Sequence, residues 1–189
     1  MGSLFLGADL SLTGSGLVVI DDSYNIVKMD VFKSKVTGVE RLFHLRNTLD
    51  SFLAEFNKED IKLVAIENYA YGKAKEGDGR VFEIGEWGGI FRLYMFDNNY
   101  NFILPSPTQV KKYITGKGEA KTKKELIILD IYKKYGIEIR QADMADAYVL
   151  ARIAKDFYNS EKNLTTSQQE VIKKIHQSIE EGTIGVLLR

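Results

Sequence analysis

Four acidic residues of this sequence have types and positions that suit a divalent-metal site. Asp9 and Glu67 each end a short apolar segment predicted to be a strand, and Asp143 and Asp146 lie three residues apart at the start of a predicted helix. If the two strands are parallel neighbours, both acids leave the same edge of the sheet, where ligands characteristically bind. The helical pair shares one face, a turn apart. We therefore expect the four carboxylates to converge.

Convergence of four carboxylates requires cations, because like charges close together repel and raise one another's pKa. Ligand sets made only of oxygen favour hard ions, so the sequence predicts Mg²⁺, for which Mn²⁺ can substitute. Two such ions about 3.5–4 Å apart can activate a water and stabilise the leaving oxygen of an in-line displacement at phosphorus. The predicted reaction is metal-assisted hydrolysis of a phosphodiester bond.

Each acid also has an ordinary structural interpretation. Asp143 suits the N-cap of a helix, and Asp146 is a favourable charge in a first helical turn. Asp9 could begin a turn, and Glu67 could be the solvated end of a strand. The prediction of catalysis therefore depends on the joint arrangement of the four residues and not on any one of them.

The composition narrows the remaining chemistry. The chain has no cysteine and two histidines, His44 and His176. Disulfides, thiolate zinc sites and cysteine nucleophiles are therefore excluded, and a histidine-based triad is poorly supported. No apolar stretch approaches the ~18 residues of a membrane span, and no basic segment leads into a signal-peptide apolar run. We expect a cytoplasmic protein, of a bacterium or a phage-infected host cell, that is not secreted and has no membrane partner.

Basic residues concentrate in one segment, although the net charge of the chain is zero. Residues 111–140 carry nine Lys or Arg against four Asp or Glu. This distribution suits a polyanion bound along one face of the protein. A solvated lysine-rich helix would have the same composition, so the charge run alone favours that simpler interpretation.

The order of predicted elements indicates one mixed α/β domain. Apolar runs separated by short turns predict three antiparallel strands, over residues 4–10, 17–20 and 26–32. A helix with a capping box of Thr37 and Glu40 follows, and then strands over 62–66 and 101–104 and helices over 81–96, 107–114, about 121–135 and 143–157. A last helix is predicted from Ser167, with Glu170 completing its capping box.

Five blocks of the sequence resemble, in order, the motifs of the RuvC family of Holliday-junction resolvases, and in particular their compact phage-encoded members. The blocks are residues 5–16, 64–68, 85–90, 107–120 and 143–147. The most specific are the first, with its Asp9-Leu10-Ser11-Leu12-Thr13 turn, and the last, Asp143-Met144-Ala145-Asp146-Ala147. The resemblance covers residues 5–154, most of the chain.

The resemblance implies an RNase H-like fold, in which helices flank a mixed five-stranded sheet of three antiparallel strands followed by parallel strands. It implies a homodimer that resolves branched DNA, a four-way junction, by paired symmetric nicks. Asp9, Glu67, Asp143 and Asp146 would be the catalytic carboxylates and the ligands of two Mg²⁺ ions. A nuclease domain would cover residues 1–158, and a C-terminal helical extension, 159–189, would pack on that domain or on the dimer interface.

The resemblance also points to residues that would contact DNA. The loop after Glu67 would reach into the junction. There a tyrosine can stack on a base, which contributes ~1–3 kcal/mol of binding free energy per base, and cations can hold phosphates. Tyr69 could equally pack within the protein. A lysine shortly after the Gly-x-Gly turn would contact the scissile region, and Lys121 and Lys123 both remain candidates for it. The full set of candidates is Tyr69, Tyr71, Lys73, Arg80, Lys117, Lys121 and Lys123.

The sequence departs from the family pattern at Glu86-Trp87, where Gln-Ala is usual, and Trp87 could belong to the core or to a seam between paired helices.

The sequence leaves other functions open. They are a flap, fork or RNA–DNA hybrid nuclease on the same fold, and a junction-binding protein without catalysis. An actin-like ATP-binding fold would need a second phosphate turn like Asp9–Gly16, and nothing repeats that segment.

Overall fold

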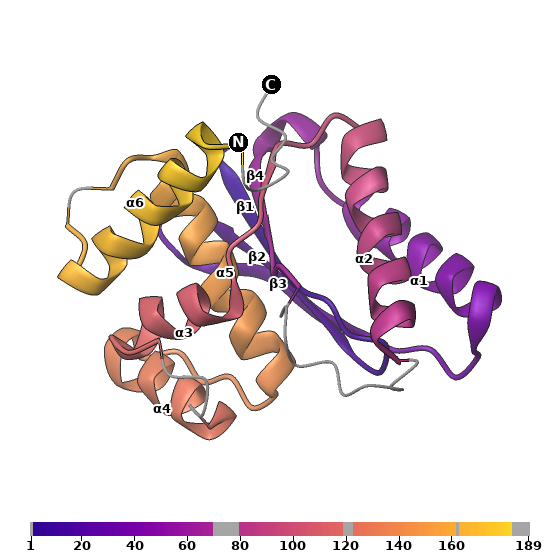
Figure 1. Cartoon of the computed structure of the whole chain (residues 1–189), viewed down its shortest axis with the longest axis horizontal. Coiled ribbons are helices and arrows are strands. Elements are labelled where there is room, and N and C mark those ends of the chain that lie inside the picture. Colours follow the sequence, from indigo (N-terminus) through magenta and orange to yellow (C-terminus); the bar gives the residue numbers. More distant parts are fainter. Residues whose placement is uncertain (1, 70–79, 119–122, 162, 183–189) are drawn as a thin grey trace.

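A mixed five-stranded sheet forms the centre of the molecule (Figure 1). The computed structural model describes residues 2–69, 80–118, 123–161 and 163–182, without the side chains of residues 80 and 81. The strand order is β3-β2-β1-β4-β5, with β1 antiparallel to β2, β2 antiparallel to β3, and β4 parallel to both β1 and β5. The strands are β1 Leu4–Asp9, β2 Ser15–Asp21, β3 Ile26–Phe32, β4 Ile61–Ile66 and β5 Phe102–Ile103. The predicted RNase H-like mixed sheet is confirmed.

Helices cover both faces of this sheet (Figure 1). One face carries α1 and α2, and the other carries α3, α4, α5 and α6. Each face has its own buried apolar cluster, because alternate residues of the central strands point to opposite sides. The helices are α1 Gly38–Leu53, α2 Arg80–Asp97, α3 Pro107–Thr115, α4 Lys124–Tyr135, α5 Ala142–Tyr158 and α6 Thr166–Glu180, with a short 3₁₀ turn η1 at Lys58–Asp60.

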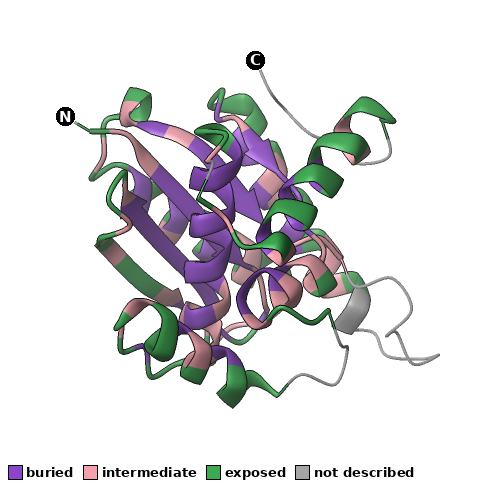
Figure 2. Ribbon diagram, turned by 90° about the vertical axis from the view of Figure 1, so that its left-hand side faces the viewer, coloured by how far each residue is buried: buried purple, intermediate pink, exposed green. Residues whose placement is uncertain are grey.

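Two glycines allow α5 to lie directly on the sheet. A Cβ at Gly7 of β1 would be 1.9 Å from the carbonyl oxygen of Ala147, and a Cβ at Gly16 of β2 would be 2.1 Å from that of Asp143. Helix backbone therefore occupies the space that side chains would otherwise fill. Every residue from Ala147 to Phe157 is buried, as Figure 2 shows for this helix. A helix buried on all sides is a core element, and α5 thus has a fixed position relative to the strand ends.

Two helix starts differ from the predicted capping boxes. Thr37 is the N-cap residue of α1, but its side chain makes no capping hydrogen bond. The residue that follows it, Gly38, has a left-handed φ of 59°, so the first turn lacks the backbone geometry of a capping box. The last helix starts at Thr166 and is capped by Thr165 with Gln168, not by Ser167 with Glu170. Thr165 with Gln168 and Ser167 with Glu170 both have the Ser/Thr-x-x-Glu/Gln spacing, so the sequence pattern alone could not choose between these two starts of the last helix.

A buried polar cluster holds the helices around α5. Asp156 is fully buried and accepts hydrogen bonds from the hydroxyls of Tyr24 and Tyr113. The guanidinium of Arg152 donates to Tyr148 at 2.9 Å and lies 3.6 Å from the ring centroid of Tyr135. Burial raises the pKa of Asp156, although its hydrogen bonds from the two tyrosines oppose that shift. The cluster ties the β2–β3 turn, α3 and α4 to one helix.

Helix α6 packs on the same face as α5. Val171, Ile172 and Ile175 belong to the apolar cluster of that face, and Glu170 forms an ion pair with Lys112 of α3. No helix in the described ranges is both long and apolar enough to cross a membrane.

Candidate active site

The first two predicted acids lie side by side where parallel strands β1 and β4 end. Ala8 of β1 is in register with Ile66 of β4, and the amide of Glu67 donates to the carbonyl of Ala8 at 3.0 Å. Asp9 is only 7% exposed. Its pKa is raised well above the usual value, first by burial and then by the negative charges of Glu67 and Asp146. A buried carboxylate among other acids needs a cation nearby.

The other two acids stand at the start of α5, facing the same strand ends. The helix begins at Ala142 with Gln141 as its N-cap, so Asp143 is a first-turn residue and not the cap. A Cβ at Gly14 would lie 3.2 Å from Oδ2 of Asp143, which places that carboxylate beside the β1–β2 turn. Burial raises the pKa of Asp146, and the charge of Asp143 adds to the effect. The other three predicted acids thus all influence Asp9.

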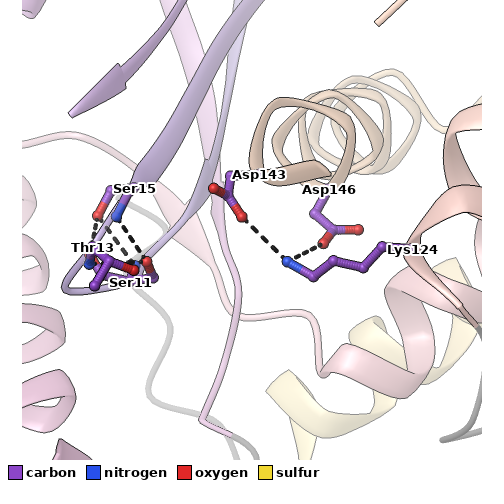
Figure 3. Close-up of polar contacts among 7 residues, drawn as sticks. Ser11, Thr13, Ser15, Lys124, Asp143 and Asp146 are labelled. Atoms are coloured by element: carbon purple, nitrogen blue, oxygen red, sulfur yellow. Dashed lines mark hydrogen bonds and ion pairs between the residues drawn. The ribbon is translucent and has the colours of Figure 1, made fainter. Parts of the chain in front are cut away.

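Lys124 is a member of this site that the sequence did not single out. Its ammonium is 3.2 Å from Oδ1 of Asp143 and 3.8 Å from Oδ2 of Asp146 (Figure 3). Partial burial lowers the pKa of Lys124. The hydrogen bond to Asp143 and the charges of Asp146 and Asp9 outweigh this effect, so the pKa is raised from its usual value. The only sequence signal was position, since Lys124 is the fourth residue of a lysine-rich stretch that starts at Lys121.

The turn between β1 and β2 is held rigidly beside the acids. The hydroxyl of Ser15 donates to the carbonyl of Ser11 at 2.7 Å and accepts from the Ser11 amide, and the Ser11 hydroxyl accepts from the amides of Thr13 and Gly14. Figure 3 shows these serines on the side of Asp143 away from Lys124. The indole of Trp87 donates to the Ser15 hydroxyl at 3.0 Å. Trp87 is fully buried, so it belongs to the core.

The donor set of this site fits hard divalent cations. No group of three or more acidic, histidine or cysteine side chains among the described residues is close enough to count as a ready metal cluster. Even so, Asp9, Glu67, Asp143 and Asp146 interact electrostatically, all four offer only oxygen, and a cationic ammonium already lies against two of them. Carboxylates without nitrogen or sulfur partners suit Mg²⁺ or Mn²⁺.

Tyr69 packs within the protein. Its hydroxyl donates to the carbonyl of Gly85 at 3.0 Å, and the guanidinium carbon of Arg92 lies 4.2 Å from its ring centroid. A Cβ at Gly88 would lie 2.4 Å from the Tyr69 hydroxyl, so this glycine of α2 makes room for the ring. The Tyr69 ring therefore packs against α2. Of the other predicted DNA contacts, Tyr71, Lys73, Lys121 and the side chain of Arg80 lie outside the described residues.

Three further described lysines lie on α3, on the turn after it and at the start of α4. Lys117 lies on the turn after α3, where Gly116 has a φ of 80°, and Lys123 is the N-cap residue of α4. Lys111 of α3 is close enough to lower the pKa of Asp146, against the upward effect of burial. Lys111 lies near the acids, and Lys117 and Lys123 add exposed positive charge on the same side of the sheet, which suits a polyanionic substrate.

The pattern of this chain matches one known family. Residues 5–154 match the family model described as crossover junction endodeoxyribonuclease RuvC. The chain belongs to the RuvC family. The RuvC protein of a Nitratiruptor species is 26% identical over 151 residues, which are 77% of this chain and 91% of the relative. That of Caldicellulosiruptor saccharolyticus is 29% identical over 153 residues, 77% of this chain and 88% of the relative.

A solved RuvC structure shares the fold. The T. thermophilus RuvC in complex with a Holliday junction substrate superposes with a TM-score of 0.64 at 18% identity, over 98% of this chain and 99% of the other. A second Thermus thermophilus RuvC structure gives a TM-score of 0.63 at 18% identity, over 97% and 99%. Both matches cover nearly the whole chain, α6 included.

Proposed function

We propose that this RuvC-family chain resolves four-way DNA junctions by paired symmetric nicks, with Asp9, Glu67, Asp143 and Asp146 as its catalytic carboxylates. The family match supports endonuclease action on crossover junctions. The observation that carries the residue assignment is geometric: Asp9 and Glu67 end adjacent parallel strands, and Asp143 and Asp146 at the start of α5 share contacts with one ammonium beside them. The raised pKa of buried Asp9, to which the other three acids contribute after burial, agrees with this arrangement. Four interacting acids at one sheet edge have no evident structural purpose, because their mutual repulsion opposes folding.

The carboxylates would hold two Mg²⁺ ions, for which Mn²⁺ can substitute. When bound, such ions activate the attacking water and stabilise the leaving 3′ oxygen, which gives a 5′-phosphate and a 3′-hydroxyl. Asp9 and Glu67 are fixed by adjacent strands, and Asp143 and Asp146 by the buried helix α5. The chain itself therefore supplies rigid positioning of the ligands, which is the part of catalysis that a protein scaffold contributes.

Cations around the carboxylates would hold the DNA backbone. Among the described lysines, we propose that Lys111, which acts on the pKa of Asp146, and the exposed Lys117 and Lys123 contact phosphates. Tyr71, Lys73, Arg80 and Lys121 remain proposed contacts from the resemblance. The T. thermophilus RuvC that shares this fold was solved with a Holliday junction substrate, which supports branched DNA as the partner here. We propose that the protein acts in the cytoplasm of a bacterium or phage-infected host cell. We also propose that residues 1–158 form a nuclease domain and that residues 159–189 are an extension of it.

The active form would be a homodimer joined through the exposed side of α2. Phe82, Leu93 and Phe96 are 79%, 58% and 50% exposed, and at Gly85 and Gly89 an added Cβ would meet nothing within 4 Å. These five positions recur every three or four residues and so form one face of the helix. An apolar face with small residues at its centre lets a second copy of the same helix approach closely, and a two-fold interface is self-complementary.

Leu93→Glu is expected to separate the protomers. A charge in the middle of an apolar, self-complementary face would raise the dimer dissociation constant by roughly 100-fold or more. Light scattering after size exclusion measures this shift. Val27→Glu, at a 50% exposed position on edge strand β3, is the matched control and should leave the dimer intact. A Leu93→Glu protein that remains dimeric at micromolar concentration would place the interface elsewhere.

End-labelled four-way junctions test the proposed function directly. We expect paired nicks at symmetric positions with Mg²⁺ or Mn²⁺ and none with EDTA, while linear duplex stays uncut. Equal cutting of flaps, forks or RNA–DNA hybrids would reduce the proposal to a general structure-selective nuclease with the same four carboxylates. Metal-independent cutting, or tight junction binding without any cleavage, would exclude the proposed chemistry.

A further inference from the structure

The position of Lys124 has a consequence for the carboxylate site. Lys124 is the first residue of α4, yet its ammonium reaches α5 and lies within 4 Å of both Asp143 and Asp146. Figure 3 shows the Lys124 side chain extended toward the two acids, with dashed lines from its ammonium to one oxygen of each. Both carboxylates are among the four that the proposed function assigns to metal ions.

We infer that Lys124 is the resident counter-cation of the metal-free site and that metal ions must displace it in order to bind. The inference rests on the proposed function, because it treats Asp143 and Asp146 as metal ligands. An ammonium and a divalent cation seek the same carboxylate oxygens, and both cannot be in contact with the same lone pairs. Lys124 and the metal are therefore competitors.

The environment of Lys124 permits such an exchange. Its side chain is 57% exposed, so the ammonium can be rehydrated when it leaves, at little cost in free energy. The side chain is long and unbranched, and α4 is anchored independently of it, by buried Ile127 and Ile131 and by the ring of Tyr135 against Tyr148. Loss of the two contacts with the acids does not require α4 to leave its place.

Two opposite effects on the protein follow from this arrangement. Without metal, Lys124 offsets the repulsion among the acids at the sheet edge and stabilises the fold. With metal, the same charge opposes the incoming cations, since like charges repel. A lysine in this position keeps the empty site intact and weakens its affinity for ions.

Manganese titration of the full-length, DNA-free protein tests the inference. Lys124→Met removes the charge and keeps much of the side-chain volume. We expect its dissociation constant for Mn²⁺ to fall by roughly three- to tenfold, which is the scale of a half-exposed ion pair. Lys124→Arg should restore an affinity near the original. Lys123→Met removes one charge from the neighbouring residue, which lacks a described ion pair, and should change the affinity less than Lys124→Met.

Thermal unfolding provides a second readout that does not depend on cleavage. Metal-free Lys124→Met should melt about 2–4 °C lower than the parent protein, and saturating Mn²⁺ should abolish that difference. Unchanged or weaker Mn²⁺ binding by folded Lys124→Met, with binding by the parent intact, would overturn the inference alone. If neither protein binds Mn²⁺ or Mg²⁺, the proposed metal site itself is wrong and the inference falls with it.

Discussion

Asp146→Asn is expected to lower the rate of junction cleavage by at least roughly 1,000-fold while the protein stays folded. The side chain of Asp146 is 13% exposed, and burial and Asp143 raise its pKa. An amide of the same shape removes the repulsion between Asp146 and Asp143, which offsets the loss of the ion pair with Lys124, so the fold is retained. It also removes one of the proposed anionic oxygen ligands, and the amide cannot replace the electrostatic attraction that would hold a divalent cation.

Junction binding by Asp146→Asn should be unchanged or tighter, because one fewer negative charge faces the DNA phosphates. Single-turnover cleavage and fluorescence anisotropy on the same labelled junction separate the two effects. Asp130→Asn changes an acid further along α4 and is the matched control, with expected cleavage within about twofold of the parent. Cleavage by Asp146→Asn at a rate close to the original would remove Asp146 from the catalytic group.

Gly16→Ala is expected to destabilise the protein by at least about 3 kcal/mol or to prevent folding. The new Cβ would lie 2.1 Å from the carbonyl oxygen and 2.5 Å from the carbonyl carbon of Asp143. These are backbone atoms of a buried helix, which cannot move aside without lifting α5 from β2. Gly7→Ala should have a comparable effect, since its Cβ would lie 2.3 Å from the amide nitrogen of Ala151. Urea unfolding followed by circular dichroism measures both.

Gly89→Ala is the control for the two glycine substitutions. An added Cβ there meets nothing within 4 Å, and alanine is favoured over glycine inside a helix by up to about 1 kcal/mol. On the Leu93→Glu background, where self-association should no longer contribute, it is expected to be neutral or stabilising. If Gly16→Ala were tolerated equally well, the close contact between α5 and the sheet would not be required for folding.

The sheet and the four acids were largely predictable because local signals agreed with the topology. Short turns after Asp9 and Asp21 force antiparallel pairing of the first strands, and an acid at the end of each parallel strand must then lie at one sheet edge. The start of α5 was predicted to within one residue, from the apolar stripe that follows Asp143.

The sequence did not predict contacts that depend on how a helix is rotated about its axis, or on how closely a helix backbone approaches a strand. Lys124 was found against the acids, whereas the candidate Lys123 is the N-cap residue of α4, because the choice depends on where α4 begins and how it is turned. The other candidate, Lys121, lies outside the described residues. The importance of Gly7 and Gly16 emerged only once α5 was known to cross their strands. Tyr69 packs on α2 through a gap at Gly88 that no sequence pattern signals.

Helix α2 touches two different parts of the molecule. Trp87 on its buried side donates to Ser15, whose hydroxyl also fixes Ser11 in the turn beside the acids. Leu93 on its exposed side lies on the proposed contact with a second copy. The hydrogen bond from Trp87 to Ser15 therefore joins this helix to the turn after Asp9. In a pair of protomers joined as proposed, one helix would contact both the second copy and the turn beside the acids.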